Sequence, residues 1–126
     1  MTSTRKLTLN PKGPKPTEKQ IQNAILEWLE IRGAFAWQND SVGIWDANRG
    51  AYRKRMGRFC IRGASDILGI WRGWPLAIEV KRHDGKLSDD QEWFLEKFRD
   101  AGGIGIVARS LEDAIKPLMK IGERPA

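Results

Sequence analysis

Cysteine and histidine are almost absent from this sequence. Its 126 residues include one cysteine, Cys60, and one histidine, His83. A single cysteine excludes an internal disulfide framework and a zinc cluster of several thiolates, and it favours a reducing compartment. His83 has no cysteine or histidine partner at metal-ligand spacing, so we expect it in a turn, and we expect Cys60 to be a buried thiol.

Long hydrophobic runs and phosphate-binding glycine loops are also missing. No apolar stretch approaches the length that spans a bilayer, and the N-terminus has no signal-peptide pattern. We therefore expect a cytoplasmic protein with no membrane partner. The cluster Gly102-Gly103-Ile104-Gly105 follows an expected helix and precedes an expected strand, which is the wrong order for a phosphate loop.

The sequence does contain enough apolar side chains for one core, together with an excess of positive charge. The hydrophobic fraction is 40%, with six tryptophans, which suits a single folded domain of this length. The net charge of +6 favours a polyanionic partner, most simply nucleic acid.

Three segments are expected along the chain: a basic arm over residues 1–16, a folded domain over 17–120 and a tail over 121–126. Lysines and arginines alternate with prolines in the first segment, and proline blocks helix formation, so we expect a flexible arm. The segment 41–61 has no clear period, and we expect an extended basic loop or a hairpin there.

Hydrophobic spacing and capping residues predict helices that alternate with short strands. The expected elements are a helix over 17–33, a strand over 34–37, a hairpin over 63–81, a helix over 88–101, a strand over 104–108 and a helix from Ser110 that Pro117 bends or shortens. A helix between two strands implies a right-handed parallel crossover. We therefore predict an α/β fold in which helices flank a mixed sheet, in αβββαβα order.

The hairpin brings charged residues to one end of the sheet. Asp66 opens its first strand, and Glu79 and Lys81 close its second, so folding at Gly73 carries Asp66 back towards them. Side chains alternate along a strand, so Glu79 and Lys81 point the same way while Val80 points into the core. Such a cluster favours a divalent metal site. The alternative is a plain surface ion pair between Glu79 and Lys81.

Asp66, a gap of twelve residues and the triplet Glu79-Val80-Lys81 resemble the PD-(D/E)XK nuclease superfamily. More narrowly, GASDILG over 63–69, the triplet EVK and LSDDQ over 87–91 resemble the VRR-NUC nuclease family, and the resemblance covers roughly residues 17–118. Ser65 stands where the superfamily name has proline, which is not a ligand. The resemblance implies a restriction-endonuclease-like core and a phosphodiester hydrolase.

The resemblance also implies roles for individual residues. Mg²⁺ or Mn²⁺ would be held by Asp66, Glu79 and the carbonyl of Val80, and Lys81 would orient or deprotonate a water and neutralise charge. Glu18 matches an acidic residue near the metal, and Gln91 matches a supporting glutamine. For these two, helix capping remains the alternative, because Glu18 lies in a first helical turn and Ser88 and Gln91 have capping-box spacing.

Contacts to DNA phosphates are expected from basic side chains that precede the hairpin. The predicted contacts are Arg49, Arg53, Lys54, Arg55, Arg58 and Arg62, with Asn39 at the end of the first strand. The alternatives are a solvated charged loop and, for Asn39, a turn. Trp45, Tyr52 and Trp74 are candidates for base stacking, with burial in the core as the alternative for each.

These observations together predict a metal-dependent DNA endonuclease for branched DNA, such as Holliday junctions or flaps, in repair or recombination. The resemblance implies a homodimer, whose two-fold symmetry would match a four-way junction. Two alternatives stay open: a non-catalytic module that binds nucleic acid or recruits other proteins, and a nuclease for linear single-stranded DNA or DNA ends.

Overall fold

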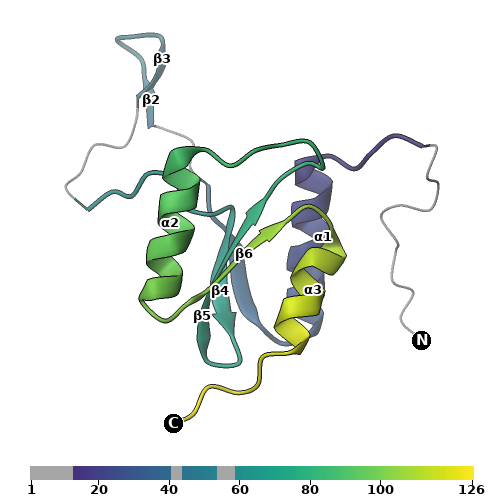
Figure 1. Cartoon of the computed structure of the whole chain (residues 1–126). Coiled ribbons are helices and arrows are strands. Elements are labelled where there is room, and N and C mark those ends of the chain that lie inside the picture. Colours follow the sequence, from purple (N-terminus) through teal and green to yellow (C-terminus); the bar gives the residue numbers. More distant parts are fainter. Residues whose placement is uncertain (1–12, 41–43, 54–58) are drawn as a thin grey trace.

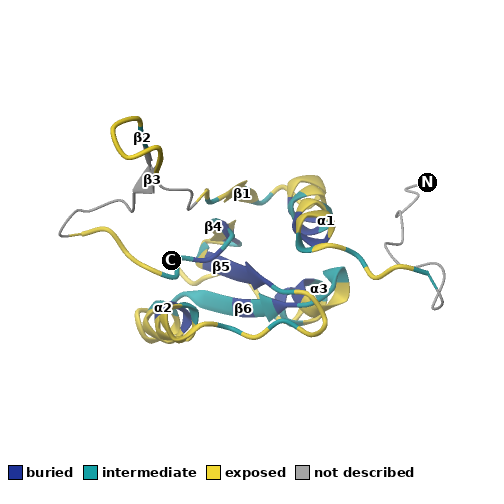
Figure 2. Ribbon diagram, turned by 90° about the horizontal axis from the view of Figure 1, so that it is seen from above, coloured by how far each residue is buried: buried dark blue, intermediate teal, exposed yellow. Residues whose placement is uncertain are grey.

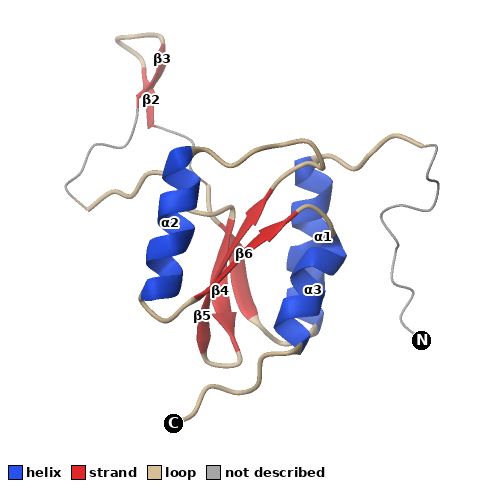
Figure 3. Ribbon diagram, viewed as in Figure 1, coloured by secondary structure: helices blue, strands red, loops and turns tan. Residues whose placement is uncertain are grey.

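A four-stranded mixed sheet with helices on both faces forms the core of the protein, as the computed structural model shows (Figure 1). The structure describes residues 13–40, 44–53 and 59–126, without the side chains of residues 44, 45, 52 and 53. The strands of the sheet are, in spatial order, β1 (Phe35–Gln38), β4 (Ile67–Trp71), β5 (Trp74–Val80) and β6 (Ile104–Ala108). β4 is antiparallel to both of its neighbours, β1 and β5, whereas β5 and β6 are parallel (Figure 3).

The helices begin at the residues that the capping patterns predict. α1 (Glu18–Ile31) starts after Thr17, and α2 (Asp89–Asp100) starts after Ser88, each with a complete capping box. α3 (Leu111–Met119) starts after Ser110 and ends two residues after Pro117. The crossover from β5 through α2 to β6 is the parallel connection that the element order predicts.

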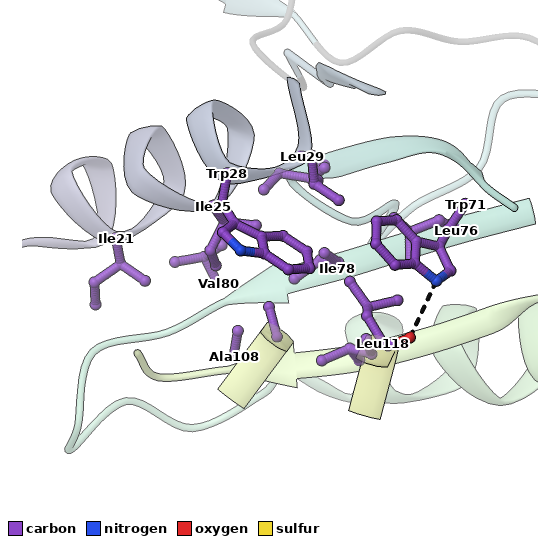
Figure 4. Packing of buried hydrophobic residues seen from close by; sticks show 13 residues of the cluster. Ile21, Ile25, Trp28, Leu29, Trp71, Leu76, Ile78, Val80, Ala108 and Leu118 are labelled. Carbon is purple, nitrogen blue, oxygen red and sulfur yellow. Dashed lines mark hydrogen bonds between the residues drawn. The ribbon is translucent and has the colours of Figure 1, made fainter. Parts of the chain in front are cut away.

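Helices lie on both sides of the sheet (Figure 2), and the buried cluster on one side is larger than that on the other. α1 and α3 cover one face, and side chains such as Ile25, Leu118 and Ile78 form the larger cluster there (Figure 4). Within it Trp28 and Trp71 stack with ring centroids 5.4 Å apart, and the Trp71 indole donates to the Leu118 carbonyl at 3.1 Å. α2 covers the opposite face, where Phe94 and Leu95 pack on Ala77 of β5.

The segment 41–61 contains a hairpin, one of the two forms expected for it. β2 (Ile44–Asp46) pairs with β3 (Ala51–Arg53) in a separate two-stranded sheet. With this hairpin as an insertion between β1 and β4, the larger sheet and its helices follow the predicted αβββαβα order. The prediction of an α/β fold with a mixed sheet is confirmed.

The turn between β4 and β5 is tied to the C-terminal residues. Arg72 and Gly73 both have positive φ, +48° and +85°, and they form the two-residue turn between the paired Trp71 and Trp74. The Trp74 indole donates to the Gly122 carbonyl at 3.0 Å. Trp74 therefore lies at the end of the hairpin opposite to Asp66, away from the cluster of charged residues.

One prediction from the sequence is wrong, and others fall outside the described residues. Cys60 is exposed, because the stretch 59–62 runs along the surface with all of its side chains exposed. His83 lies in a turn, as expected. Residues 1–12 of the predicted basic arm lie outside the described part of the chain. Among the helices of the described residues, none has both the length and the apolar character needed to cross a membrane.

Candidate active site

Asp66 is held at the start of β4 by the strands on either side of it. Its Oδ2 accepts a hydrogen bond from the Val80 main-chain N–H at 2.9 Å. On the other side, the Asn39 main-chain N–H donates to the Asp66 carbonyl at 2.7 Å, and the Asn39 side chain donates to the Ser65 carbonyl at 3.2 Å. Hydrogen bonds from β5 and from the residue after β1 thus fix the Asp66 carboxylate beside the end of β5.

Glu79 lies beside Asp66, on the face of the sheet that α2 covers. Only 2% of its surface is exposed. Its Oε1 accepts a hydrogen bond from the Gln91 side chain at 2.9 Å. Its Oε2 is buried and has no hydrogen-bond donor among the residues that the structure describes. Among the described residues, Oε1 is therefore fixed by Gln91, whereas Oε2 has no donor.

The protonation of Glu79 reflects this environment. Burial, followed by the charge of the neighbouring Asp66 carboxylate, raises the pKa of Glu79 to about 8. Lys81 lowers the pKa of Glu79, and Glu18 has a small raising effect. With no cation bound, Glu79 keeps its proton at neutral pH, because a second negative charge beside Asp66 is unfavourable in a buried site.

Gln91 both caps α2 and contacts the acidic pair. Its main-chain N–H donates to Ser88 Oγ at 3.2 Å, and its Oε1 accepts from the Ser88 N–H at 2.9 Å. The same side-chain amide donates through Nε2 to Glu79. The sequence presented capping and site support as alternatives, and one side chain does both because an amide carries a donor and an acceptor.

Glu18 lies at the edge of the site, in the first turn of α1. Its Oε2 accepts a hydrogen bond from the Arg82 main-chain N–H at 3.2 Å. Its charge raises the pKa of Glu79, as does the charge of Asp66, whose effect is larger. The α1 N-terminus is thereby attached to the segment that follows Lys81.

Gly63 lets the loop before Asp66 approach the first turn of α2, a feature that sequence reasoning missed. Its φ is +75°, and a Cβ at this position would lie 2.3 Å from the Asp90 carbonyl carbon and 2.6 Å from the Gln91 nitrogen. No side chain fits there. The glycine thus brings the Asp66 loop against the helix that carries Gln91.

Arg109, which sequence reasoning also missed, fixes the turn after Lys81. Its Nη1 donates to the carbonyls of Arg82, at 2.7 Å, and of Gly85. The Lys81 main-chain N–H donates to the Ala108 carbonyl at 3.0 Å, which extends the β5–β6 pairing by one residue. The main chain of Lys81 is therefore held on both sides of the residue.

Two solved structures share this arrangement of strands and helices. One, described as "VRR_NUC domain protein", has a TM-score of 0.56 and 18% identity, over 87% of this chain and 93% of its own. The other, described as "VRR_NUC domain", has a TM-score of 0.54 and 24% identity, over 82% of this chain and 94% of its own. The chain has the fold of VRR_NUC domains. The prediction of a VRR-NUC-type α/β fold is thereby confirmed.

The similarity is structural rather than one of sequence. No protein-family profile and no curated protein sequence matches the chain. At these low identities the neighbours establish the fold, and the chemistry has to be argued from the site itself.

The oxygens at the site suit a hard divalent cation. The carboxylates of Asp66 and Glu79 converge there, and the Val80 carbonyl belongs to the same strand end. Within the described ranges, no three Asp, Glu, His or Cys side chains gather closely enough to hold a metal, so Glu18 does not complete such a group. A cation would give the buried Glu79 Oε2 a partner and relieve the repulsion within the pair, so the residues present fit Mg²⁺ or Mn²⁺.

The predicted DNA contacts are only partly within the described structure. Arg49 and Arg62 are exposed, and Arg62 directly precedes the glycine that packs on α2. Arg53 belongs to β3, but its side chain is not described, and neither are those of Trp45 and Tyr52. Lys54, Arg55 and Arg58 lie outside the described residues. Asn39 uses its amide N–H to hold the Asp66 segment, so its described contact is a positioning one.

Proposed function

We propose that this chain is a metal-dependent DNA endonuclease of the VRR-NUC type that hydrolyses phosphodiester bonds in branched DNA. The observation that carries the proposal is the acidic pair, in which Glu79 is buried and Asp66 is half-buried: Glu79 Oε2 has no donor among the described residues, and Asp66 lies beside it. Natural proteins rarely retain a buried carboxylate pair without a cation, a proton or a function that requires it. The shared fold of the two VRR_NUC domain structures supports the same conclusion.

A simple ion pair between Glu79 and Lys81 explains the site less well. Such a pair would keep the Glu79 carboxylate ionised, whereas the pKa of Glu79 stays at about 8 despite the lowering effect of Lys81. The dominant influences are burial and Asp66. An ion pair also gives no reason for Gln91 to fix one carboxylate oxygen and leave the other without a donor.

The chain's own residues would divide the chemistry among them. When bound by Asp66, Glu79 and the Val80 carbonyl, Mg²⁺ or Mn²⁺ would supply a Lewis acid that neutralises phosphate charge and makes water more acidic. Lys81, whose charge acts on Glu79, would orient the attacking water, accept its proton or stabilise charge on the phosphate oxygens. Gln91 would hold Glu79 in one orientation, and Asn39 would hold the Asp66 segment.

The substrate we propose is branched DNA, such as a Holliday junction or a flap, bound by a homodimer. The net charge of +6 supports a nucleic-acid partner, since cationic side chains neutralise backbone phosphates. A single small domain carries one such site, so two copies related by a two-fold axis would match the symmetry of a four-way junction.

Cleavage of a panel of labelled DNAs tests this function. Junction, flap, duplex and single-stranded DNAs are incubated with the protein and Mg²⁺ or Mn²⁺, and products are resolved on denaturing gels. We expect cleavage of branched DNA by the wild type and at least a roughly hundredfold loss in Asp66→Asn and in Glu79→Gln, because each removes a negatively charged oxygen ligand.

The matched control is Glu30→Gln, the same chemical change at an exposed position near the other end of α1. It should cleave like the wild type. Undiminished metal-dependent cleavage in both site variants would refute the proposed active site, and tight binding without any cleavage would favour a recruitment module.

A further inference from the structure

The sheet face that carries the candidate site continues beside it as an apolar surface that the described helices leave exposed. α2 packs on β5 and β6, and on the same face β1 and β4 expose large side chains. Phe35 is 70% exposed, Trp37 45% and Ile70 48%. We call these three residues the aromatic face.

Strand alternation establishes which side of the sheet they occupy. Ala36 packs into the core under α1 and α3, so its neighbours Phe35 and Trp37 point to the opposite side. Leu68 of β4 packs with the α2 cluster, and Ile70, two residues further on, shares its side. The aromatic face and Glu79 therefore lie on the same side of the sheet.

The strand register places the aromatic face next to the acidic pair. Asn39 after β1 bonds to Asp66, which contacts the end of β5. In the adjacent row of the sheet, Trp37 is paired with Leu68, and one row further Phe35 is paired with Ile70. Rows on one face of a strand are about 7 Å apart, so the Trp37 ring stands within one nucleotide's reach of Asp66.

The chemistry of this surface fits a nucleobase. Trp37 and Phe35 lie side by side with ring centroids 5.4 Å apart and a tilt of 49°, so each offers an aromatic face to a partner. Exposed aromatic side chains are usual elements of single-strand binding, since every base has a face that can stack.

We propose that Trp37, supported by Phe35, is a stacking platform for an unpaired base next to the phosphate that a cation at Asp66 and Glu79 would hold. The proposal rests on the proposed function, because the acidic pair is taken as the position of the phosphate. It narrows the substrate to DNA with at least one unpaired nucleotide near the cut. Bases inside an intact duplex are already stacked on each other, so the platform discriminates against fully paired DNA.

Fluorescence anisotropy in EDTA tests the platform without cleavage. The full chain is titrated into a labelled flap DNA, the same flap with abasic sites in its unpaired stretch, and a blunt duplex. We expect Trp37→Leu to weaken flap binding roughly tenfold, the effect of losing one stacked base, and to leave duplex and abasic binding unchanged. Trp37→Phe should restore most of the affinity, since it keeps an aromatic ring.

Trp93→Leu is the matched control, because Trp93 is a tryptophan of α2 that is 50% exposed and lies outside the aromatic face. It should bind all three DNAs like the wild type. The proposal is overturned if Trp37→Leu binds the flap normally or weakens all three DNAs equally. It is also overturned if light scattering shows a lower molar mass for Trp37→Leu than for the wild type, since the aromatic face would then be an interface between two copies of the chain. Failure of the proposed function is a separate result: no metal-dependent cleavage by the wild type.

Discussion

At the scale of single residues, Glu79 is the most informative side chain in the protein. It is buried, and among the described residues only its Oε1 accepts a hydrogen bond. Burial and the charge of Asp66 raise its pKa to about 8. Ser65, directly before Asp66, is also fully buried, and its hydroxyl has no hydrogen-bond partner among the described residues. A small apolar side chain would therefore suit that position as well as serine does.

The raised pKa of Glu79 predicts how stability depends on pH in the absence of metal. From the ordinary value of 4.5 up to about 8, the folded protein keeps a proton on Glu79 that the unfolded chain has lost. The free energy of unfolding therefore falls as pH rises through this interval, and the fall ends near the folded pKa. Glu79→Gln cannot ionise, so the variant should lack this fall.

Thermal melts followed by circular dichroism in EDTA measure this dependence. Between pH 4.5 and pH about 8, the Tm of the wild type should fall by several degrees more than the Tm of Glu79→Gln. At the upper pH the variant should be the more stable protein. Glu30→Gln should follow the wild type. Melting curves of wild type and Glu79→Gln that change in parallel with pH would contradict the assigned environment of Glu79.

At the scale of elements, the N-terminus of α2 links a local helix signal to the site. The capping box of Ser88 and Gln91 fixes the first turn, and the same glutamine reaches Glu79 across to β5. The position of the helix therefore sets the orientation of the carboxylate. The two roles of Gln91 can be separated by substitution.

Gln91→Glu should mainly reduce cleavage, and Ser88→Ala should mainly reduce stability. Glutamate at this position keeps the capping-box spacing but replaces the donor to Glu79 with a third carboxylate, so we expect a roughly 10- to 100-fold loss of cleavage, together with a loss of stability that comes from the site and not from the cap. Ser88→Ala removes the cap, so we expect a loss of about 1 kcal/mol in the free energy of unfolding and a smaller effect on cleavage. Urea melts and initial cleavage rates measure the two quantities. Equal losses of both in the two variants would mean that Gln91 acts only as a cap.

The features that could be predicted from the sequence depend on short-range patterns. The caps at Thr17 and Ser88, the two-residue turn at Gly73 and the alternation of Glu79 with Val80 are all set by neighbours within a few residues. These local rules were sufficient to predict the order of elements along the chain, the mixed sheet and the position of Asp66 near the end of β5.

The features that were missed depend on contacts between distant segments. The approach of Gly63 to Asp90 and the hydrogen bonds of Arg109 to the 82–85 turn have no local sequence pattern. Trp37 was missed for the same reason, because its exposure follows from the limited area that α2 covers. Cys60 was wrongly predicted as buried, since a lone cysteine carries no information about the path of its loop.

At the scale of the whole molecule, the ends of several elements meet around one acidic pair. The start of β4, the end of β5 and the first turns of α1 and α2 contribute Asp66, Glu79, Glu18 and Gln91 respectively. The chain as a whole is positively charged, so this acidic site lies in a molecule that attracts polyanions. A cation at the site would remove the local conflict between acidic ligands and a phosphate substrate.

Calorimetric titration with Mn²⁺ tests this central claim most directly. We expect the wild type and Glu30→Gln to bind Mn²⁺ at the same site, and Glu79→Gln and Asp66→Asn to lose that binding, because each variant removes a charged oxygen ligand. All four proteins should show the same far-ultraviolet circular dichroism, so that lost binding is not lost folding. Mn²⁺ binding that is equal in wild type and in both site variants would contradict the assignment of the acidic pair as a metal site.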